Sequence, residues 1–280
     1  MHGTATLLDD FSLEMTARDL PQLLETAATL PTDTRVNVTY LGTEDAADRL
    51  AAAKAVADGG LTPVPHISAR RVTSPEVLAD FLGAHQAQGT QEKVFVIGGD
   101  PREPQGPYSD ALSIIGSGIL PEFGVREVGI GGYPEGHPDI SDAALWAALA
   151  DKSASIVDQG LDGTIITQFS FDTDAVLAWA ERVRGLGIEL PIRVGVPGPA
   201  GIKRLLGFAR RCGVGSSTTL ARKYGFSVTN LVGTAGPDRF VEDLASSIDP
   251  GRHGDIRVHF FTFGGLDATA GWVQNHLATV

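Results

Sequence analysis

The stretch Lys93-Val-Phe-Val-Ile-Gly-Gly-Asp100 decides the fold. Four apolar residues run straight into two glycines and a carboxylate, a pattern typical of a buried parallel strand that ends at an open edge. Four further stretches share this design, each an apolar run that closes on polar or aromatic residues: 35–42, 62–68, 127–133 and 164–171. We therefore expect function at the residues that end these strands.

The length and composition favour a soluble globular protein. At 280 residues, with 42% hydrophobic and 20% charged residues, the chain suits one (β/α)₈ barrel or two smaller domains. The formal net charge of -12 argues against nucleic acid or an anionic membrane as a partner, since both select for basic surfaces.

The cysteine, the histidines and the apolar runs bear on disulfides, metal sites, membrane spans and localisation. The single cysteine, Cys212, cannot form an internal disulfide, and a reduced structural thiol is expected. No Cys and His cluster has the spacing of metal ligands, and no apolar run approaches the length of a membrane span. The N-terminus lacks the pattern of a signal peptide, so a cytoplasmic protein is predicted.

The remaining elements follow from apolar periodicity and from capping residues. Further strands are predicted at 11–16, 191–196 and 259–263, which brings the number of strands to eight. Helices are predicted between them, and a helical excursion with a turn at 213–219 is expected before the last strand. The predicted helical ranges are 19–30, 44–58, 73–88, 108–116, 141–159, 173–185, two or three helices within 199–248, and 268–277.

Strands and helices that alternate at spacings of roughly 30 residues indicate a parallel α/β fold, and eight strands are the number that closes a barrel. The alternative is an open, doubly wound sheet, which would usually carry a G-x-G-x-x-G loop at the start of a helix. The sequence has no such loop and no linker-like segment. We predict a single (β/α)₈ TIM barrel over residues 1–280, with an extra helical excursion before the last strand.

The carboxyl ends of barrel strands form the active site of such enzymes. Each residue there also has a structural explanation: a solvated strand end, a core histidine, a turn aspartate or a packed aromatic ring. Their coincidence at successive strand ends favours binding of a flat polar heterocycle, with carboxylates for proton transfer. These residues are Glu14, Thr39, His66, Asp100, Tyr133, His137, Gln168 and the turn 195–198.

Several segments, spread over nearly the whole chain, resemble the catalytic barrel of the methylenetetrahydrofolate reductase family. The more specific of them are Tyr133-Pro-Glu-Gly-His-Pro138 and Ile166-Thr-Gln-Phe169, in this order and spacing. The others are Val38–Tyr40, Pro65–Ile67, Gly99–Pro101, Val157–Gly160, Phe171–Asp172 and His259–Thr262.

The resemblance implies that 5,10-methylenetetrahydrofolate and 5-methyltetrahydrofolate are interconverted, with hydride from NADH or NADPH passing through bound FAD. Glu14 would protonate N10 as a general acid, and Asp100 would hold the pterin near the flavin. The resemblance also implies a folate substrate and a homo-oligomer. Gln168, Phe171 and Phe208 would bind the folate, and the FAD residues would be Thr39, His66, Gly99, Asp100, Tyr108, Tyr133, His137 and Lys152.

The chain departs from the family pattern at three places. The family surrounds its acid with Phe-Glu-Phe-Phe-Pro-Pro, whereas this chain has Phe11-Ser-Leu-Glu-Met-Thr16. Gly98 stands where the family has an arginine at the FAD diphosphate, and Ile156 stands where it has a lysine, with Lys152 about one turn earlier. The alternatives are therefore a flavin-independent reductase of the same substrate, a pterin-binding methyltransferase, and a regulatory folate-binding barrel.

Overall fold

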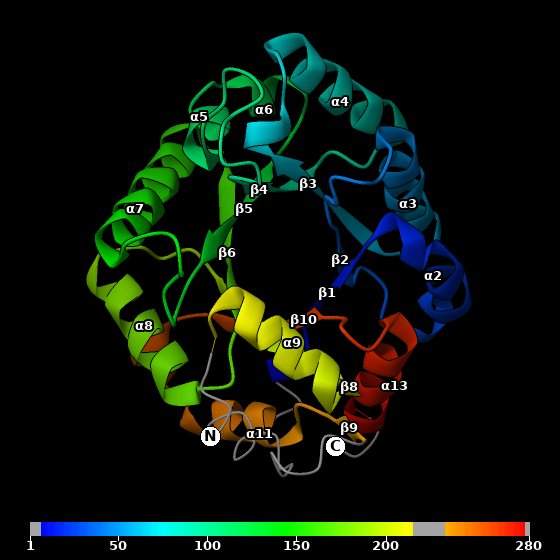
Figure 1. The fold of residues 1–280 in the computed structure, drawn as a ribbon, viewed down its shortest axis with the longest axis vertical. Coiled ribbons are helices and arrows are strands. Elements are labelled where there is room, and N and C mark those ends of the chain that lie inside the picture. The colour runs from blue at the N-terminus through cyan, green and yellow to red at the C-terminus, as the bar shows by residue number, and fades with distance from the viewer. Residues whose placement is uncertain (1–6, 215–232, 278–280) are drawn as a thin grey trace. The chain divides into compact units, whose positions relative to one another are not determined.

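The computed structural model describes residues 7–214 and 233–277. Its strands form a closed barrel in the order β1-β10-β7-β6-β5-β4-β3-β2, which confirms the predicted (β/α)₈ architecture (Figure 1). All eight predicted strands are present, with ends shifted by a few residues. Their bounds are β1 (Ser12–Met15), β2 (Arg35–Val38), β3 (Thr62–Ser68), β4 (Lys93–Ile97), β5 (Glu127–Gly132), β6 (Asp162–Phe169), β7 (Ile192–Pro197) and β10 (Ile256–Phe261).

The predicted helices are also present. The excursion before β10 contains α9 and α11, together with a short antiparallel pair that the sequence did not predict, β8 (Ala200–Gly201) with β9 (Thr234–Ala235). Most of the predicted turn at 213–219 lies outside the described residues. The helices are α2 (Leu20–Thr26), α3 (Ala46–Asp58), α4 (Pro75–Gln88), α5 (Ala111–Ile115), α6 (Ile119–Glu122), α7 (Asp142–Asp158), α8 (Thr173–Gly185), α9 (Ile202–Cys212), α11 (Asp238–Ser247), α12 (Pro250–His253) and α13 (Leu266–Leu277).

The chain divides into two compact units, apart from the residues not described. Unit 1 comprises Met1–Leu13, Gly132–Leu145 and Ile166–Val280, and unit 2 comprises Glu14–Gly131 and Trp146–Ile165. The single catalytic domain over residues 1–280 stays a prediction.

In unit 2, the helices α2, α3 and α4 lie on the outer side of β2, β3 and β4 (Figure 1). Local chemistry sets the ends of α4. The Ser74 side chain accepts a hydrogen bond from the Val77 amide, and Pro75 occupies the first turn, where its missing N–H costs nothing. Gly89 ends the helix with φ 68°, a left-handed conformation that glycine adopts without strain.

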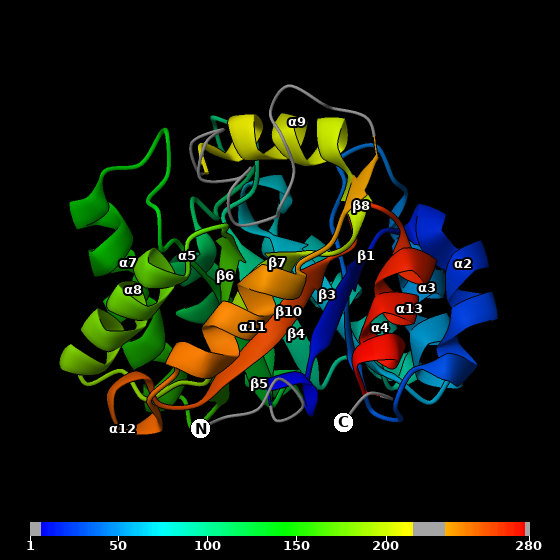
Figure 2. The same ribbon diagram turned by 90° about the horizontal axis from the view of Figure 1, so that it is seen from below.

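In unit 1, α9 crosses one end of the strands and α12 lies toward the opposite end (Figure 2). Asp172 caps α8, because its carboxylate accepts hydrogen bonds from the amides of Asp174 and Ala175. Gly195 is required on β7 because a Cβ there would lie 2.4 Å from the Thr167 carbonyl oxygen of β6. The backbones of β6 and β7 approach closely at this level.

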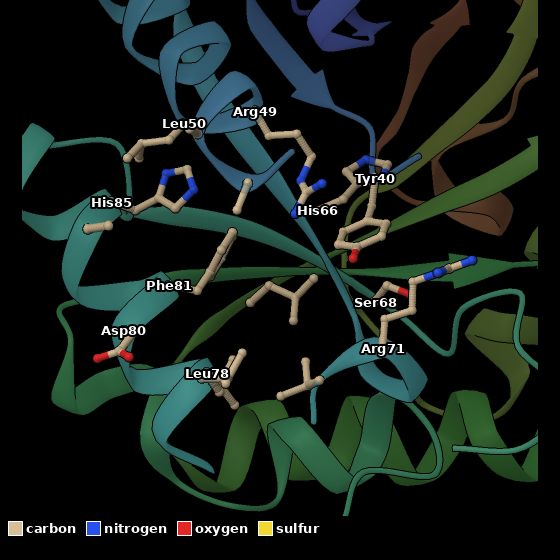
Figure 3. Close-up of a pocket in the computed structure, with 16 residues that line it drawn as sticks. Tyr40, Arg49, Leu50, His66, Ser68, Arg71, Leu78, Asp80, Phe81 and His85 are labelled. Carbon is tan, nitrogen blue, oxygen red and sulfur yellow. The ribbon is translucent and has the colours of Figure 1, made fainter. Parts of the chain in front are cut away.

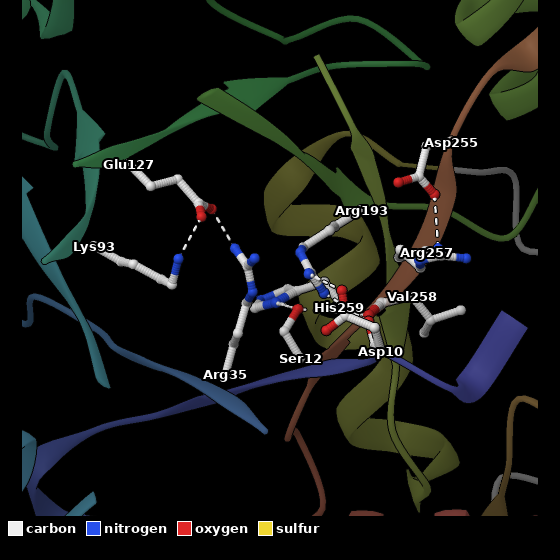
Figure 4. Close-up of polar contacts among 10 residues, drawn as sticks. All are labelled: Asp10, Ser12, Arg35, Lys93, Glu127, Arg193, Asp255, Arg257, Val258 and His259. Carbon is white, nitrogen blue, oxygen red and sulfur yellow. Dashed lines mark hydrogen bonds and ion pairs between the residues drawn. The ribbon is translucent and has the colours of Figure 1, made fainter. Parts of the chain in front are cut away.

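Charged side chains on the first residues of three strands of unit 2 neutralise one another (Figure 4). Glu127 of β5 pairs with Arg35 of β2 and accepts a hydrogen bond from Lys93 of β4 at 2.6 Å. Burial alone raises the pKa of Glu127, but the two cations outweigh burial and hold that pKa below its ordinary value. Glu127 is therefore ionised in the folded protein at neutral pH.

A second group of polar side chains in unit 1 connects the start of β1 to β7 and β10. The Arg193 side chain, 3% exposed, donates to the Asp10 carboxylate at 2.6 Å and to the Asp10 carbonyl oxygen at 2.7 Å. The hydroxyl of Ser12 lies 2.9 Å from Nδ1 of His259 on β10. These contacts fix the entry of the chain into β1 (Figure 4).

We expect Glu127→Gln to lower the free energy of unfolding by about 3 kcal/mol, because it leaves two partly buried cations without their counter-ion. Denaturant unfolding at pH 7 measures this. The folded-state pKa is depressed, so the wild-type contribution is present above the ordinary glutamate pKa of about 4.3 and is lost as pH falls through the lower folded-state value. The two proteins should therefore converge in stability in acid.

Glu181→Gln is the matched control, because it removes an exposed ion pair with Arg252. This variant should unfold like the wild type. Equal destabilisation by both substitutions would contradict the special role of Glu127.

Candidate active site

The proposed acid, Glu14, lies on β1 and is half-buried. Its Oε1 accepts a hydrogen bond of 2.7 Å from the hydroxyl of Thr39, which follows β2. The Thr39 amide in turn donates to the Met15 carbonyl oxygen at 2.8 Å. The backbone bond fixes the position of Thr39, so the structure holds the Glu14 carboxyl group in one orientation.

The second predicted carboxylate, Asp100, follows β4 and receives a two-pronged ion pair from Arg71. The Nε and Nη2 of Arg71 donate to the two carboxylate oxygens at 2.8 and 2.7 Å. These hydrogen bonds lower the pKa of Asp100. Gly42 makes room for this pair, since a Cβ there would lie 2.4 Å from the Arg71 guanidinium.

Gly99 supports the turn that carries Asp100. Its φ of 94° favours glycine, and a Cβ would lie 2.2 Å from the Ser68 hydroxyl oxygen. Gly99 was expected among the FAD residues, and the geometry of the turn is by itself a sufficient reason for a glycine at this position.

We expect Arg71→Met to raise the pKa of Asp100, because the substitution removes both hydrogen bonds to its carboxylate. A carboxyl ¹³C NMR titration measures this shift. Arg70→Met is the control, since Arg70 bonds the carbonyl oxygens of Ser109 and Pro101 instead. An unchanged Asp100 titration in Arg71→Met would show that the ion pair does not form in solution.

Three more predicted residues of unit 2 are partly or fully enclosed by protein. His66 on β3 is 6% exposed, with Nε2 3.2 Å from Nδ2 of Asn37 and its ring against Phe95. Tyr108 is 7% exposed. Lys152 lies on α7, and desolvation lowers its pKa to about 8, with Asp110 acting in the opposite direction.

A cavity of about 400 Å³ borders α3, α4 and the end of β3 (Figure 3). Its walls are mostly apolar, with Leu50 and Phe81 among them. The guanidinium of Arg49 lies 3.9 Å from the centroid of the Tyr40 ring, which also borders the cavity. This volume falls in the range of small-ligand pockets.

In unit 1, the predicted residues occupy the ends of β5 and β6. Tyr133 and His137 meet edge to face, with ring centroids 5.5 Å apart, and burial raises the pKa of Tyr133, with the charge of Cys212 adding to it. Oε1 of Gln168 accepts a hydrogen bond of 3.1 Å from the Phe169 amide. Phe171 is fully buried against Phe169, so its ring offers no surface to a ligand.

Phe208 lies on α9 and stacks on Phe263, with ring centroids 3.9 Å apart and planes inclined by 8°. Arg211 lies 5.4 Å from the centroid of the Phe208 ring. This arrangement provides an aromatic platform with a cation beside it, suited to a flat anionic ligand.

Sequence reasoning missed three contributors to these groups. Arg71 and Phe263 gave no signal, because their partners lie far away in the sequence. The Ser170 hydroxyl donates to Glu135 at 2.6 Å, which links the segment 133–138 to the end of β6. In the sequence, only the polar side chains of Ser170 and Glu135 pointed to a possible hydrogen bond between these two segments.

Among residues 7–214 and 233–277, no group of three His, Cys, Asp or Glu side chains is placed to hold a metal ion. The helices of the same ranges include none that is long and apolar enough to cross a membrane.

A parallel barrel with carboxylates, an amide and aromatic rings at its strand ends defines a class of enzyme that binds small polar ligands at those ends. The chain belongs to the methylenetetrahydrofolate reductase family, since the family profile described as "Methylenetetrahydrofolate reductase" matches residues 11–269.

Curated relatives agree with this assignment. The chain is 32% identical over 136 residues to "Methylenetetrahydrofolate reductase (NADH) 1" of Arabidopsis thaliana, covering 44% of this chain and 22% of that protein. It is 33% identical over 152 residues to "Probable methylenetetrahydrofolate reductase (NADH)" of Oryza sativa subsp. japonica, covering 49% and 25%. It is 29% identical over 150 residues to "5,10-methylenetetrahydrofolate reductase" of Pectobacterium carotovorum subsp. carotovorum, covering 54% and 48%. The matches thus span between about a fifth and a half of these relatives' lengths.

The residues present do not fit the FAD that the resemblance implies. FAD carries a diphosphate, which proteins hold with guanidinium groups, lysines or helix N-termini. Gly98 has no side chain, and Ile156, at the position of the family lysine, is fully buried. Of the FAD residues expected from the resemblance, Lys152 is the one lysine or arginine, beside the two histidines His66 and His137.

Proposed function

We propose that this chain interconverts 5,10-methylenetetrahydrofolate and 5-methyltetrahydrofolate, with NADH or NADPH as the hydride donor. Family membership over residues 11–269 is the observation that carries this proposal. The names of the plant relatives, which specify NADH, favour NADH as the donor. The flavin relay implied by the resemblance is not part of the proposal, because Gly98 and Ile156 stand where the family has basic residues.

Glu14 acts as the general acid in this proposal. Opening the five-membered ring of the substrate leaves electron density on N10, and a proton delivered to N10 makes the amine a better leaving group. The Thr39 hydroxyl holds Oε1 of Glu14 at 2.7 Å, so the carboxyl group does not need to find its orientation when substrate binds.

Asp100 binds the pterin. Its ionised carboxylate accepts hydrogen bonds from ring N–H groups, and the fork of Arg71 fixes the carboxylate plane. Gln168 and the Phe208 ring are the proposed folate contacts of unit 1. Phe171 is not retained in this role, because its ring is buried.

We expect Glu14→Gln to slow formation of 5-methyltetrahydrofolate by about 10²- to 10⁴-fold, because an amide cannot donate the proton that a general acid supplies. Substrate affinity should change little, because glutamine keeps the size of the side chain. Product is measured by chromatography, and binding by fluorescence titration.

Thr39→Val is the companion variant, since it keeps the acid but removes the bond that orients it. A loss of about tenfold is expected, smaller than that of Glu14→Gln. Full activity of Glu14→Gln would contradict the role of this acid, and lack of product from the wild type would reject the proposed function.

A further inference from the structure

We infer that this chain transfers hydride directly from C4 of the nicotinamide to the folate, without a flavin between them. This inference rests on the proposed function and deepens it, since it makes the nicotinamide dinucleotide the ligand that the barrel itself binds. Four observations in unit 2 support it.

The first observation concerns the anchors of a resident dinucleotide. Gly98 offers no side chain to a phosphate, and a Cβ built there meets no atom within 4 Å, so the backbone itself does not exclude a side chain at this position. Ile156 is fully buried on α7, where a lysine ammonium would be enclosed in the core. Each lost charge-assisted hydrogen bond weakens phosphate binding by about ten- to a hundredfold.

The second observation is that the nearby guanidinium groups are already bonded. Arg71 gives Nε and Nη2 to Asp100. Arg70 gives Nε to the Ser109 carbonyl oxygen and Nη1 to the Pro101 carbonyl oxygen. These bonds direct most of each guanidinium fork toward protein acceptors, which leaves Nη1 of Arg71 and Nη2 of Arg70 outside these bonds.

The third observation is that polar groups expected to face the flavin are bonded within the protein. The Thr39 hydroxyl donates to Glu14. His66 is enclosed between Asn37 and Phe95, with little of its ring exposed. A site built for a permanent flavin would direct such groups toward the ligand.

The fourth observation is that Lys152 remains. Desolvation lowers its pKa to about 8, so it is still mostly protonated at neutral pH, and an anion beside it would favour the charged form. One such contact suits a co-substrate that must dissociate after each turnover, with KM values of about 1 μM to 1 mM. A resident cofactor needs much tighter binding.

The reaction balances without another redox group. The bond between N10 and the methylene carbon breaks, its electron pair goes to N10, and the Glu14 proton forms the N10–H bond. Hydride from C4 then adds to the carbon of the resulting N5 iminium, which gives 5-methyltetrahydrofolate and oxidised nicotinamide. Glu14 regains its proton from water, so one reduced nicotinamide and one proton are consumed.

Isotope transfer tests the inference on the purified full chain. With [4,4-²H₂]NADH in ordinary water, direct transfer places one deuterium in the methyl group of the product, which mass spectrometry detects. With unlabelled NADH in heavy water, the methyl group should stay unlabelled.

A flavin relay predicts the opposite pattern, since the hydrogen on N5 of a reduced flavin exchanges with solvent. Loss of the deuterium from labelled NADH, together with its uptake from heavy water, would overturn direct transfer while leaving the proposed function intact. Absence of any methyl product would instead reject the proposed function, and the inference with it.

Gly98→Arg gives a test that does not depend on activity. Restoring the guanidinium should tighten FAD binding about tenfold, measured by quenching of FAD fluorescence. Gly185→Arg is the matched control, because it adds the same charge at the end of α8, where a Cβ also meets no atom within 4 Å. Tight FAD binding by the wild-type chain, or no gain of Gly98→Arg over Gly185→Arg, would overturn the argument from the missing anchors.

Discussion

A parallel barrel buries the inward side chains of its strands, so every charge placed there needs a counter-charge. Glu127, 8% exposed between Arg35 and Lys93, meets this constraint at the beginning of three strands of unit 2. Unit 1 meets it with Arg193 and Asp10. These charges are neutralised where the strands begin, whereas the polar residues that ligands contact lie at the carboxyl ends of the strands.

The polar residues at those ends are organised in pairs. Thr39 orients Glu14, and Arg71 orients Asp100, so each carboxylate has a fixed geometry before any ligand arrives. Such preorganisation favours catalysis, because the groups do not reorganise during the reaction. It also limits what else can bind, because a ligand that needs Thr39 or Arg71 must compete with a bond of normal length.

The sequence predicted the strands well because each is an apolar run that ends in a polar residue, and it predicted the start of α4 from Pro75 in its first turn. It identified Glu14 and Asp100 by their place after strands, but not their partners. Arg71 lies 29 residues before Asp100 and reaches it only once β3 and β4 pair. The burial of Phe171 was equally hidden, since an aromatic residue after a strand serves a core or a ligand with the same local pattern.

Because the whole chain is negatively charged, binding of an anion depends strongly on the few cations at the strand ends. A net charge of -12 repels an anionic dinucleotide at long range, so binding depends on local contacts that offset this repulsion. Gly98 and Ile156 remove two such contacts relative to the family pattern, and the ion pair with Asp100 already occupies Arg71. The single cationic contact of Lys152 suits a nucleotide that binds, donates its hydride and dissociates. Moderate affinity is an advantage for such a co-substrate, because it allows fast release of the oxidised nucleotide. The same substitutions that weaken a permanent flavin site are thus compatible with a working site for a dissociating hydride donor.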